Sequence, residues 1–381
     1  MSVIVQKYGG SSVADADKIQ RVAARIEETR KGGHSVVVVV SAMGDTTDEL
    51  LALARRVTPN PHRRELDMLL TAGERISMAL LSMALHARGV EAVSFTGSQS
   101  GIITDGAHTN ARIVEIRPVR ILEEVAKGRV VIVAGYQGVS REKEITTLGR
   151  GGSDTTAVAL AAALEADVCE ICSDVDGVYT ADPRIVPQTM RLAELSHEEM
   201  QELSHAGAKV LNAQAVEFAR DRGITIHARS TFQKGSQGTQ VRKQATRELR
   251  ISGVAQDLEL LVVSGGGEVL EVLRRHGAWP REATLEAGKL RAIVPLENVH
   301  GLDALLADLR GIATVEDGLA QVSIVGSGIG AAKEPLDRAL QILGLVPRGT
   351  YVSPLRISFL VPRADAAACV RRLHAEFVSK A

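Results

Sequence analysis

Short apolar runs alternate with helical patterns through the first part of the chain. Val3–Gln6 and Val36–Val40 predict buried strands, and the unbroken β-branched run of the second is typical of a parallel strand covered on both faces. Ala16–Lys31 has the apolar spacing of a helix. Arg129–Ala134 and Val168–Ser173 repeat the strand pattern, each after a helix. This alternation predicts an α/β domain with a mainly parallel sheet.

Gly-rich turns follow three of these strands, after Gln6, Val40 and Ala134. In parallel sheets, ligands bind where the carboxyl ends of the strands meet the loops. We therefore expect the functional site at that edge of the sheet.

The pattern changes after a polar, Gly-containing stretch at 233–247, which is typical of a linker. Beyond it the elements follow the order strand, helix, strand, strand, helix, strand. The first such unit comprises Leu258–Ser264, Glu268–His276, Ala283–Glu286, Arg291–Pro295, Leu302–Arg310 and Ile312–Val315. The second lacks its last strand and comprises Gln321–Val325, Pro335–Leu343, Val346–Val352, Arg356–Val361 and Ala366–Phe377. An extra strand at Leu249–Ala255 precedes both, so we expect it to complete the second unit, with the first unit inserted inside the second.

Composition narrows the class of protein. The 381 residues allow two or three domains, and a net charge of -1 with 3% aromatic residues gives no reason to expect a nucleic-acid partner. Three cysteines argue against a disulfide framework. The start MSVIVQKYGG lacks the features of a signal peptide, and the apolar runs are too short to span a bilayer. We therefore expect a cytoplasmic protein without a membrane partner.

The sequence KYGGSS at 7–12 lies between a predicted strand and a predicted helix. Gly9 and Gly10 would let backbone N–H groups approach an anion, and Lys7 would add a mobile positive charge. An ordinary Gly-rich turn would have the same pattern, so this motif alone does not distinguish a phosphate-binding turn from a plain one.

The sequence TTLGRGGSDTTAVALAAAL at 146–164 is more specific. Ser153 and Asp154 can cap the helix that follows, but capping does not require Arg150 between two glycines. A guanidinium in such a loop can hold a carboxylate through two hydrogen bonds.

The sequence SDVDGVYTADPR at 173–184 follows a predicted strand and lacks the ligand spacing of an EF-hand, so we interpret it as a nucleotide-holding loop or a plain turn. Cys169 and Cys172 form a CxxC on a predicted strand, where they would point to opposite faces, and buried structural thiols are expected. The histidines show no metal-ligand spacing, and no metal site is predicted.

With these three motifs together, the chain resembles the aspartate kinases. Further blocks of resemblance, in order, are VVVVVSAMGDTTDEL at 36–50, LLTAGERIS at 69–77, SFTGSQSGI at 94–102, GAKVL at 207–211 and HARSTF at 227–232. The resemblance implies an amino-acid kinase αβα sandwich at 1–245, followed by two ferredoxin-like ACT modules at 249–381. The modules would comprise about 258–317 and 249–255 plus 319–381.

The resemblance also implies roles on the nucleotide side of the site. Lys7 and Lys209 would neutralise the transferring γ-phosphoryl group, and Asp154 would orient these lysines. The phosphates would be held by Gly9, Gly10 and Ser41. The nucleotide would be flanked by Ser173, Asp174, Tyr179 and Arg184.

On the substrate side, the resemblance implies that Arg150 binds the α-carboxylate of L-aspartate and that Glu74 lies near its ammonium group. Thr47, Asp48 and Ser153 would complete the pocket. The implied reaction is the ATP-dependent phosphorylation of the aspartate β-carboxylate, with Mg²⁺ carried by ATP. It is the first step of lysine, threonine, methionine and isoleucine biosynthesis.

The C-terminal third departs from the family pattern. ACT modules often bind an amino acid at a turn with an acidic residue and a Pro-Gly step, but here the turns are VVSGGGEVLEVL at 262–273 and VGSGIGAAKEPLDRAL at 325–340. Feedback by lysine or threonine is therefore a hypothesis, and the modules could serve only packing or dimerisation. A homodimer is expected by default.

Three other interpretations stay open from the residues alone. The chain could be another kinase of the same fold, acting on glutamate, acetylglutamate, carbamate or a nucleotide, although Arg150 and the two-module tail argue against this. It could be a non-catalytic amino-acid sensor, although Lys7, Arg150 and Asp154 are intact. An NAD-dependent enzyme using Gly326, Gly328 and Gly330 is disfavoured, because the spacing is GxGxG and not GxGxxG.

Overall fold

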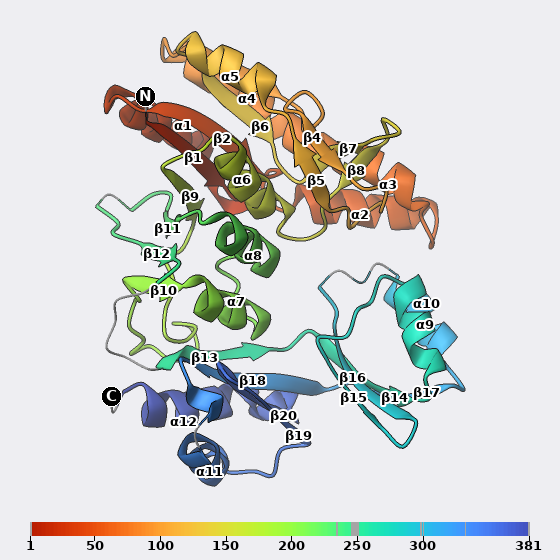
Figure 1. Ribbon diagram of the computed structural model, residues 1–381. Coiled ribbons are helices and arrows are strands. Elements are labelled where there is room, and N and C mark those ends of the chain that lie inside the picture. The colour runs from red at the N-terminus through yellow and green to blue at the C-terminus, as the bar shows by residue number, and fades with distance from the viewer. Residues whose placement is uncertain are drawn as a thin grey trace. The chain divides into compact units, whose positions relative to one another are not determined.

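The computed structural model describes residues 2–233, 235–244, 251–297, 299, 301–331 and 333–379. The chain forms two compact units (Figure 1). The first comprises Met1–Val178, Arg191–Gln201 and Lys209–Thr246, and the second comprises Tyr179–Met190, Glu202–Ala208 and Arg247–Ala381.

An eight-stranded sheet with the order β10-β12-β11-β9-β1-β2-β6-β3 forms the centre of the first unit. Its strands are β1 (Val3–Tyr8), β2 (Ser35–Val40), β3 (Ala92–Phe95), β6 (Val130–Ala134), β9 (Val168–Ser173), β10 (Glu194–Ser196), β11 (Ile226–Ser230) and β12 (Thr239–Arg242). All neighbouring strands are parallel except β11 and β12. The predicted α/β fold with a mainly parallel sheet is confirmed.

Helices accompany this sheet and the loops around it. They are α1 (Ala16–Lys31), α2 (Thr46–Val57), α3 (Arg63–Leu70), α4 (Ala72–Ala87), α5 (Val119–Ala126), α6 (Gly152–Ala163), α7 (His197–His205) and α8 (Ala213–Arg222). A smaller sheet with the order β5-β4-β7-β8 was not predicted, and its strands are β4 (Ile102–Thr104), β5 (Ile113–Ile116), β7 (Gln137–Ser140) and β8 (Ile145–Thr147).

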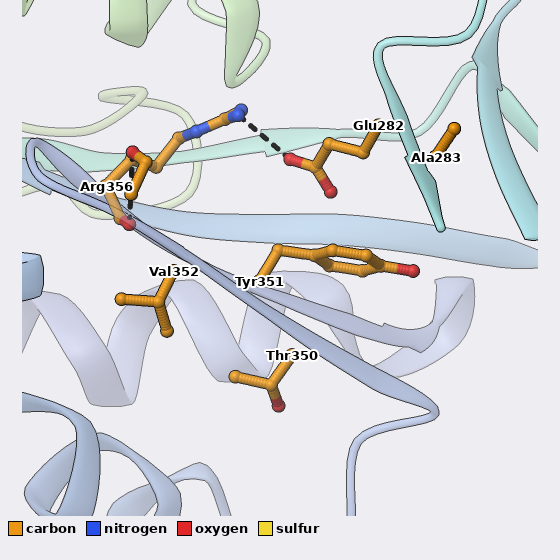
Figure 2. A pocket seen from close by; sticks show the side chains of 7 residues that line it. Glu282, Ala283, Thr350, Tyr351, Val352 and Arg356 are labelled. Atoms are coloured by element: carbon orange, nitrogen blue, oxygen red, sulfur yellow. Dashed lines mark hydrogen bonds and ion pairs between the residues drawn. The ribbon is translucent and has the colours of Figure 1, made fainter. Parts of the chain in front are cut away.

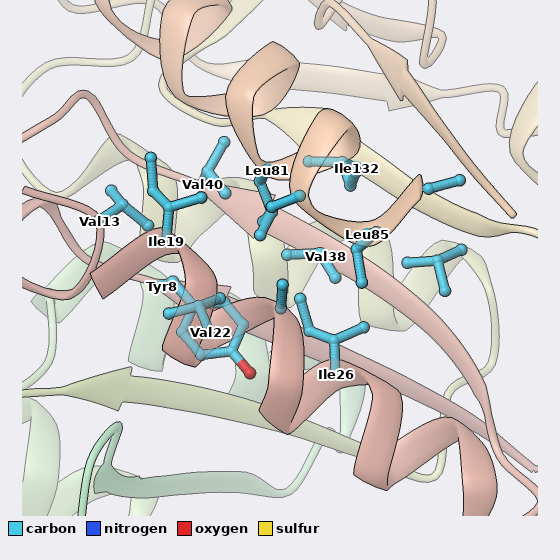
Figure 3. Close-up of a cluster of buried hydrophobic side chains, with 14 of the residues drawn as sticks. Tyr8, Val13, Ile19, Val22, Ile26, Val38, Val40, Leu81, Leu85 and Ile132 are labelled. Carbon is cyan, nitrogen blue, oxygen red and sulfur yellow. The ribbon is translucent and has the colours of Figure 1, made fainter. Parts of the chain in front are cut away.

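Strand β2 shows why the sheet is covered on both faces. Val36, Val38 and Val40 belong to a buried cluster with side chains of α1 and α4. Figure 3 shows Val38 and Val40 in this cluster. Val37 and Val39 alternate with them and are also fully buried, and α6 packs against β1, β2 and β9. Because side chains alternate across a strand, an unbroken run of valines requires apolar cover on both sides.

Helix α6 is rich in alanine because it is buried almost all round. It packs against the central sheet and also against α8, and five consecutive residues from Ala157 to Ala161 are buried. Small side chains allow the sheet and α8 to approach the helix closely, which fixes the position of its N-terminal turn. Cys169 and Cys172, on the neighbouring β9, are buried free thiols, as predicted.

One helical stretch, Arg63–Ala87, has the length and apolar composition to cross a membrane. Half of its most apolar window is buried inside the protein, and its α4 part packs against α1, β3 and β6. A core helix of a folded domain meets the same criterion, and this packing is that of a core helix.

The second unit contains two four-stranded antiparallel sheets, each with two helices. The first module comprises β14 (Leu260–Gly265), α9 (Glu268–Arg275), β15 (Glu282–Glu286), β16 (Lys289–Pro295), α10 (Leu302–Leu309) and β17 (Ala313–Glu316). The second comprises β18 (Leu319–Gly326), α11 (Lys333–Leu343), β19 (Gly349–Ser353), β20 (Arg356–Pro362), α12 (Ala366–Phe377) and β13 (Ile251–Asp257).

The early strand β13 completes the later module. It pairs antiparallel with β18, just as β17 pairs antiparallel with β14 in the first module. The predicted insertion of the first module into the second is therefore confirmed. Leu249, part of the predicted strand, lies outside the described residues, as do 234 and 245–247 of the predicted linker.

Candidate functional site

The three predicted Gly-rich turns lie at one edge of the central sheet. The strands before them, β1, β2 and β6, are consecutive and parallel in the sheet, so their carboxyl ends meet. The turn after β1 contacts the turn after β2: the N–H of Gly44 donates to the carbonyl of Gly10, 3.1 Å away. A Cβ at Gly10 would lie only 2.9 Å from the Gly44 carbonyl oxygen and 3.0 Å from that of Ala42. Only glycine fits there without moving backbone.

Lys7 and Asp154 form an ion pair at this edge. Lys7 is on β1, Asp154 is in the first turn of α6, and the Lys7 Nζ lies 2.7 Å from the Asp154 Oδ1. Their side chains are 13% and 9% exposed. The other carboxylate oxygen of Asp154 accepts from the N–H of Asn212, 3.3 Å away. This bond ties the segment that contains Lys209, an exposed residue three positions earlier, to the same carboxylate.

The loop before α6 presents Arg150. Gly151 adopts φ +72°, and a Cβ there would overlap the side chain of Asn212. Asn212 caps α8 and donates from its Nδ2 to the carbonyl of Arg150, 3.1 Å away. The Arg150 guanidinium is 58% exposed and lies 3.5 Å from the Asp48 carboxylate in the first turn of α2. The loop therefore directs a cation towards the start of α2, which also carries Thr47.

Glu74 is a buried carboxylate near the turn after β2. It is in the first turn of α4 and is 3% exposed. Its Oε1 accepts from the N–H of Ala42, 3.1 Å away, while its buried Oε2 has no hydrogen-bond partner among the residues that the structure describes. Burial raises the pKa of Glu74 to about 7, because a low dielectric disfavours the charged form. A cationic ligand would satisfy this oxygen and lower that pKa.

Ser41 and Ser153 lie close to this edge. Ser41 directly follows β2, and its carbonyl accepts from the Ser77 hydroxyl of α4, 2.7 Å away. Ser153 is buried in α6, and a Cβ at Gly135 would lie 2.7 Å from its Oγ. The N–H of Gly9 donates to the carbonyl of Cys172 over a long 3.3 Å, a bond that a phosphate oxygen would have to replace.

The predicted nucleotide-flanking residues divide between the two units. Ser173 ends β9 in the first unit, where its Oγ accepts from the N–H of Val175, 3.3 Å away, and the next residue, Asp174, is exposed. Tyr179 and Arg184 belong to the second unit. The Arg184 side chain is 88% exposed and pairs with Asp182 at 2.7 Å. A shared nucleotide site for these four residues stays a prediction.

Sequence reasoning missed Asn212, which contacts both Arg150 and Asp154. The signal was present, because Asn before a helical pattern predicts an N-cap, and its side chain does accept from the N–H groups of Gln214 and Ala215. Its contacts with Arg150 and Asp154 depend on the distant 150–154 segment, and no local sequence pattern reveals them.

The second unit has a pocket of about 370 Å³ (Figure 2). Its lining residues are Glu282, Ala283, Thr350, Tyr351, Val352, Ser353 and Arg356. Arg356 pairs with Glu282 at 2.8 Å and with Glu202 at 3.0 Å. Glu202 is in the part of α7 that belongs to the second unit. The opposite charges in this pocket therefore already satisfy one another.

Comparison with known proteins fits this fold and site. A model of the amino acid kinase family matches residues 2–230, which defines the class of protein. The aspartokinase of Mycolicibacterium smegmatis is 45% identical, with 99% of this chain and 96% of the relative covered. The chain belongs to the aspartokinase family, as the sequence motifs predicted.

Two solved structures of E. coli aspartokinase III are similar along their whole length. The complex with aspartate and ADP, in the R-state, has a TM-score of 0.86 and 26% identity, covering 98% of this chain and 99% of the other. The complex with lysine and aspartate, in the T-state, has a TM-score of 0.77 and 25% identity, covering 99% of each chain.

Proposed function

We propose that this protein transfers the γ-phosphoryl group of ATP to the β-carboxylate of L-aspartate, giving 4-phospho-L-aspartate and ADP. The observation that carries the proposal is the Lys7–Asp154 pair at the carboxyl end of β1. A cation held there by a largely buried carboxylate is suited to a transferring phosphoryl group. Membership of the aspartokinase family supports aspartate as the acceptor.

The chemistry requires positioning and charge neutralisation and no general base. The acceptor carboxylate has an unperturbed pKa of about 3.9 and is ionised at neutral pH. A carboxylate oxygen forms a bond to the γ-phosphorus while the bond from that phosphorus to the β,γ-bridging oxygen breaks, and ADP leaves with the bonding electrons. Mg²⁺ enters with ATP as part of the substrate and shields the phosphate charges.

Lys7 and Lys209 neutralise the charge that develops on the γ-phosphoryl group, and Asp154 orients them. Support for this assignment comes from the hydrogen bond between Asp154 and Asn212, which ties down the 209–212 segment. Gly9, Gly10 and Ser41 hold phosphate oxygens at the turns after β1 and β2. Ser173, the last residue of β9, and Asp174, which follows it, contact the nucleotide.

Arg150 and Glu74 recognise the two charged groups on the α-carbon of aspartate. Arg150 binds the α-carboxylate through its exposed guanidinium. Glu74 accepts from the ammonium group, which supplies the donor that its buried Oε2 lacks among the described residues. Thr47, Asp48 and Ser153 form the rest of the pocket.

Residues 1–245 act as the catalytic domain of a cytoplasmic homodimer, and 249–381 act as its regulatory ACT region. Lysine binding by E. coli aspartokinase III supports lysine as a feedback effector, and threonine is the second candidate.

Hydroxylamine trapping of the acyl phosphate tests the function. With MgATP, we expect product with L-aspartate and at most a trace with L-glutamate. Lysine and threonine, added separately, should lower the rate if the altered turns still bind them. No product with aspartate would overturn the proposed activity, whereas product that neither amino acid affects would remove only the regulatory part.

The role of Glu74 predicts a pH dependence of aspartate binding. Because its pKa is raised to about 7, Glu74 is ionised above pH 7 and neutral below it. Only the ionised form can pair with an ammonium group, so KM for aspartate should rise below pH 7, approaching roughly tenfold per pH unit. Initial rates from pH 5.5 to 8.5 measure this, with KM for MgATP as the internal control. Glu74→Gln should have a high KM that no longer changes with pH, and a wild-type slope in that variant would exclude the assignment.

A further inference from the structure

Asp67 is a fully buried carboxylate that none of the predicted roles uses. It lies in α3 and is 0% exposed. Its oxygens accept from the Nδ1 of His108 at 2.6 Å, the hydroxyl of Thr147 at 2.5 Å and the N–H of Thr109 at 3.1 Å. Three segments distant in sequence therefore meet at one side chain.

A buried carboxylate is costly to keep. Burial raises the pKa of Asp67, while the hydrogen bonds from Thr147 and His108 act in the opposite direction. An apolar residue would fill this position on an amphipathic helix without that cost. The segments that contain His108, Thr109 and Thr147 therefore indicate the role of the Asp67 carboxylate.

The first of these segments leads directly to the substrate loop. Thr147 ends β8, and Arg150 follows three residues later. The N–H of the next residue, Leu148, donates to the carbonyl of Tyr136 at 2.9 Å. The carboxylate thus fixes one end of the short stretch that presents the guanidinium.

The helix that carries Asp67, α3, leads to Glu74. The N–H of Thr71 donates to the backbone carbonyl of Asp67 at 3.2 Å, and α4 with Glu74 in its first turn follows at once. The carbonyl of Thr71 in turn accepts from the side chain of Gln137 at 3.3 Å. Asp67 therefore lies at the junction between the helix that carries Glu74 and the strand that leads to Arg150.

Two residues at this junction have strained backbones. Thr109 adopts φ +68° and Tyr136 adopts φ +69°. Residues other than glycine seldom adopt this left-handed conformation, and it is most costly for a β-branched residue such as Thr109. The Asp67 carboxylate accepts from the N–H of Thr109 itself. Strain of this kind persists where surrounding contacts over-determine it, and it clusters at ligand sites.

We propose that Asp67 is a positioning residue that sets the distance between Arg150 and Glu74 and so prepares the site for a small α-amino acid. His108, which is 23% exposed at the side chain, closes this junction from the loop at 105–112. This inference rests on the proposed function, because it assumes that these two residues hold aspartate. It assigns Asp67 no contact with either substrate.

The test is the Asp67→Asn variant of the full chain, which keeps the shape of the side chain but places an amide N–H among three donors. We expect KM for aspartate to rise at least tenfold, with KM for MgATP within twofold of wild type. Ile121→Ala, which removes a buried side chain from α5, is the control for lost stability. It should lower the melting temperature without changing KM for aspartate relative to KM for MgATP.

Unchanged KM for aspartate in Asp67→Asn, or a parallel rise in both KM values, would overturn the inference. If Asp67→Asn does not fold, His108→Ala is the deciding variant, and we expect its KM for aspartate to rise severalfold. His108→Gln retains a hydrogen-bond donor and should largely reverse this rise. No change in His108→Ala would equally overturn it. A wild-type protein that makes no acyl phosphate would instead refute the proposed function, so the two failures are distinguishable.

Discussion

Lys7→Ala should lower kcat by about 10²- to 10³-fold while KM for aspartate stays within about threefold of wild type. In its proposed role the lysine acts on charge that develops at the γ-phosphoryl group, so its loss should weaken stabilisation of the transition state far more than the binding of the amino acid. Steady-state rates of acyl phosphate formation, with aspartate and MgATP varied independently, measure both quantities.

The control must separate this effect from lost stability. Lys7→Ala leaves Asp154, 9% exposed, without its ion-pair partner, and breaking a buried pair costs about 3–5 kcal/mol. The double variant Lys7→Ala with Asp154→Asn removes that buried charge and should recover much of the melting temperature but none of the activity. Activity that returns with stability in the double variant would mean that Lys7 is structural.

The fold could be predicted because its signals are local. The valine run of β2 requires cover on both faces, and the Ala16–Lys31 pattern coincides with α1. The nested module followed from counting, since one strand was in excess before the first unit and one was missing after the second. Pairing of β13 with β18 confirms that count.

The small sheet of β4, β5, β7 and β8 could not be predicted in the same way. Its strands are three or four residues long, too short to show a clear alternation of apolar and polar positions. Yet β8 leads to Arg150, and the buried Asp67 joins it to α3. The order of the site residues is visible in sequence, whereas the contacts that hold them depend on packing between distant segments.

The same distinction between local patterns and packing applies to the candidate site. Motifs indicated Lys7, Arg150 and Asp154, and the structure brings Lys7 and Asp154 to 2.7 Å of each other. No motif could reveal that one oxygen of Glu74 is buried without a hydrogen-bond partner among the described residues, because that depends on what α4 packs against. The pKa of a carboxylate is a property of its surroundings, which sequence spacing does not specify.

Arg150→Gln should raise KM for aspartate by about 30- to 150-fold, with KM for MgATP little changed. A guanidinium bound to a carboxylate makes charge-assisted hydrogen bonds worth about 2–3 kcal/mol, and about 1.4 kcal/mol corresponds to a tenfold change in affinity. The measurement is the same steady-state assay, with Arg141→Gln, a change at another exposed arginine of the first unit, as the matched control.

Arg150→Lys distinguishes a carboxylate clamp from a simple positive charge. Lysine keeps the charge but cannot make two parallel hydrogen bonds, so KM for aspartate should fall between those of wild type and Arg150→Gln. Because the guanidinium is 58% exposed, neither change should lower the melting temperature appreciably. Full activity in Arg150→Lys would mean that charge alone suffices, and an unchanged KM in Arg150→Gln would assign the α-carboxylate to another group.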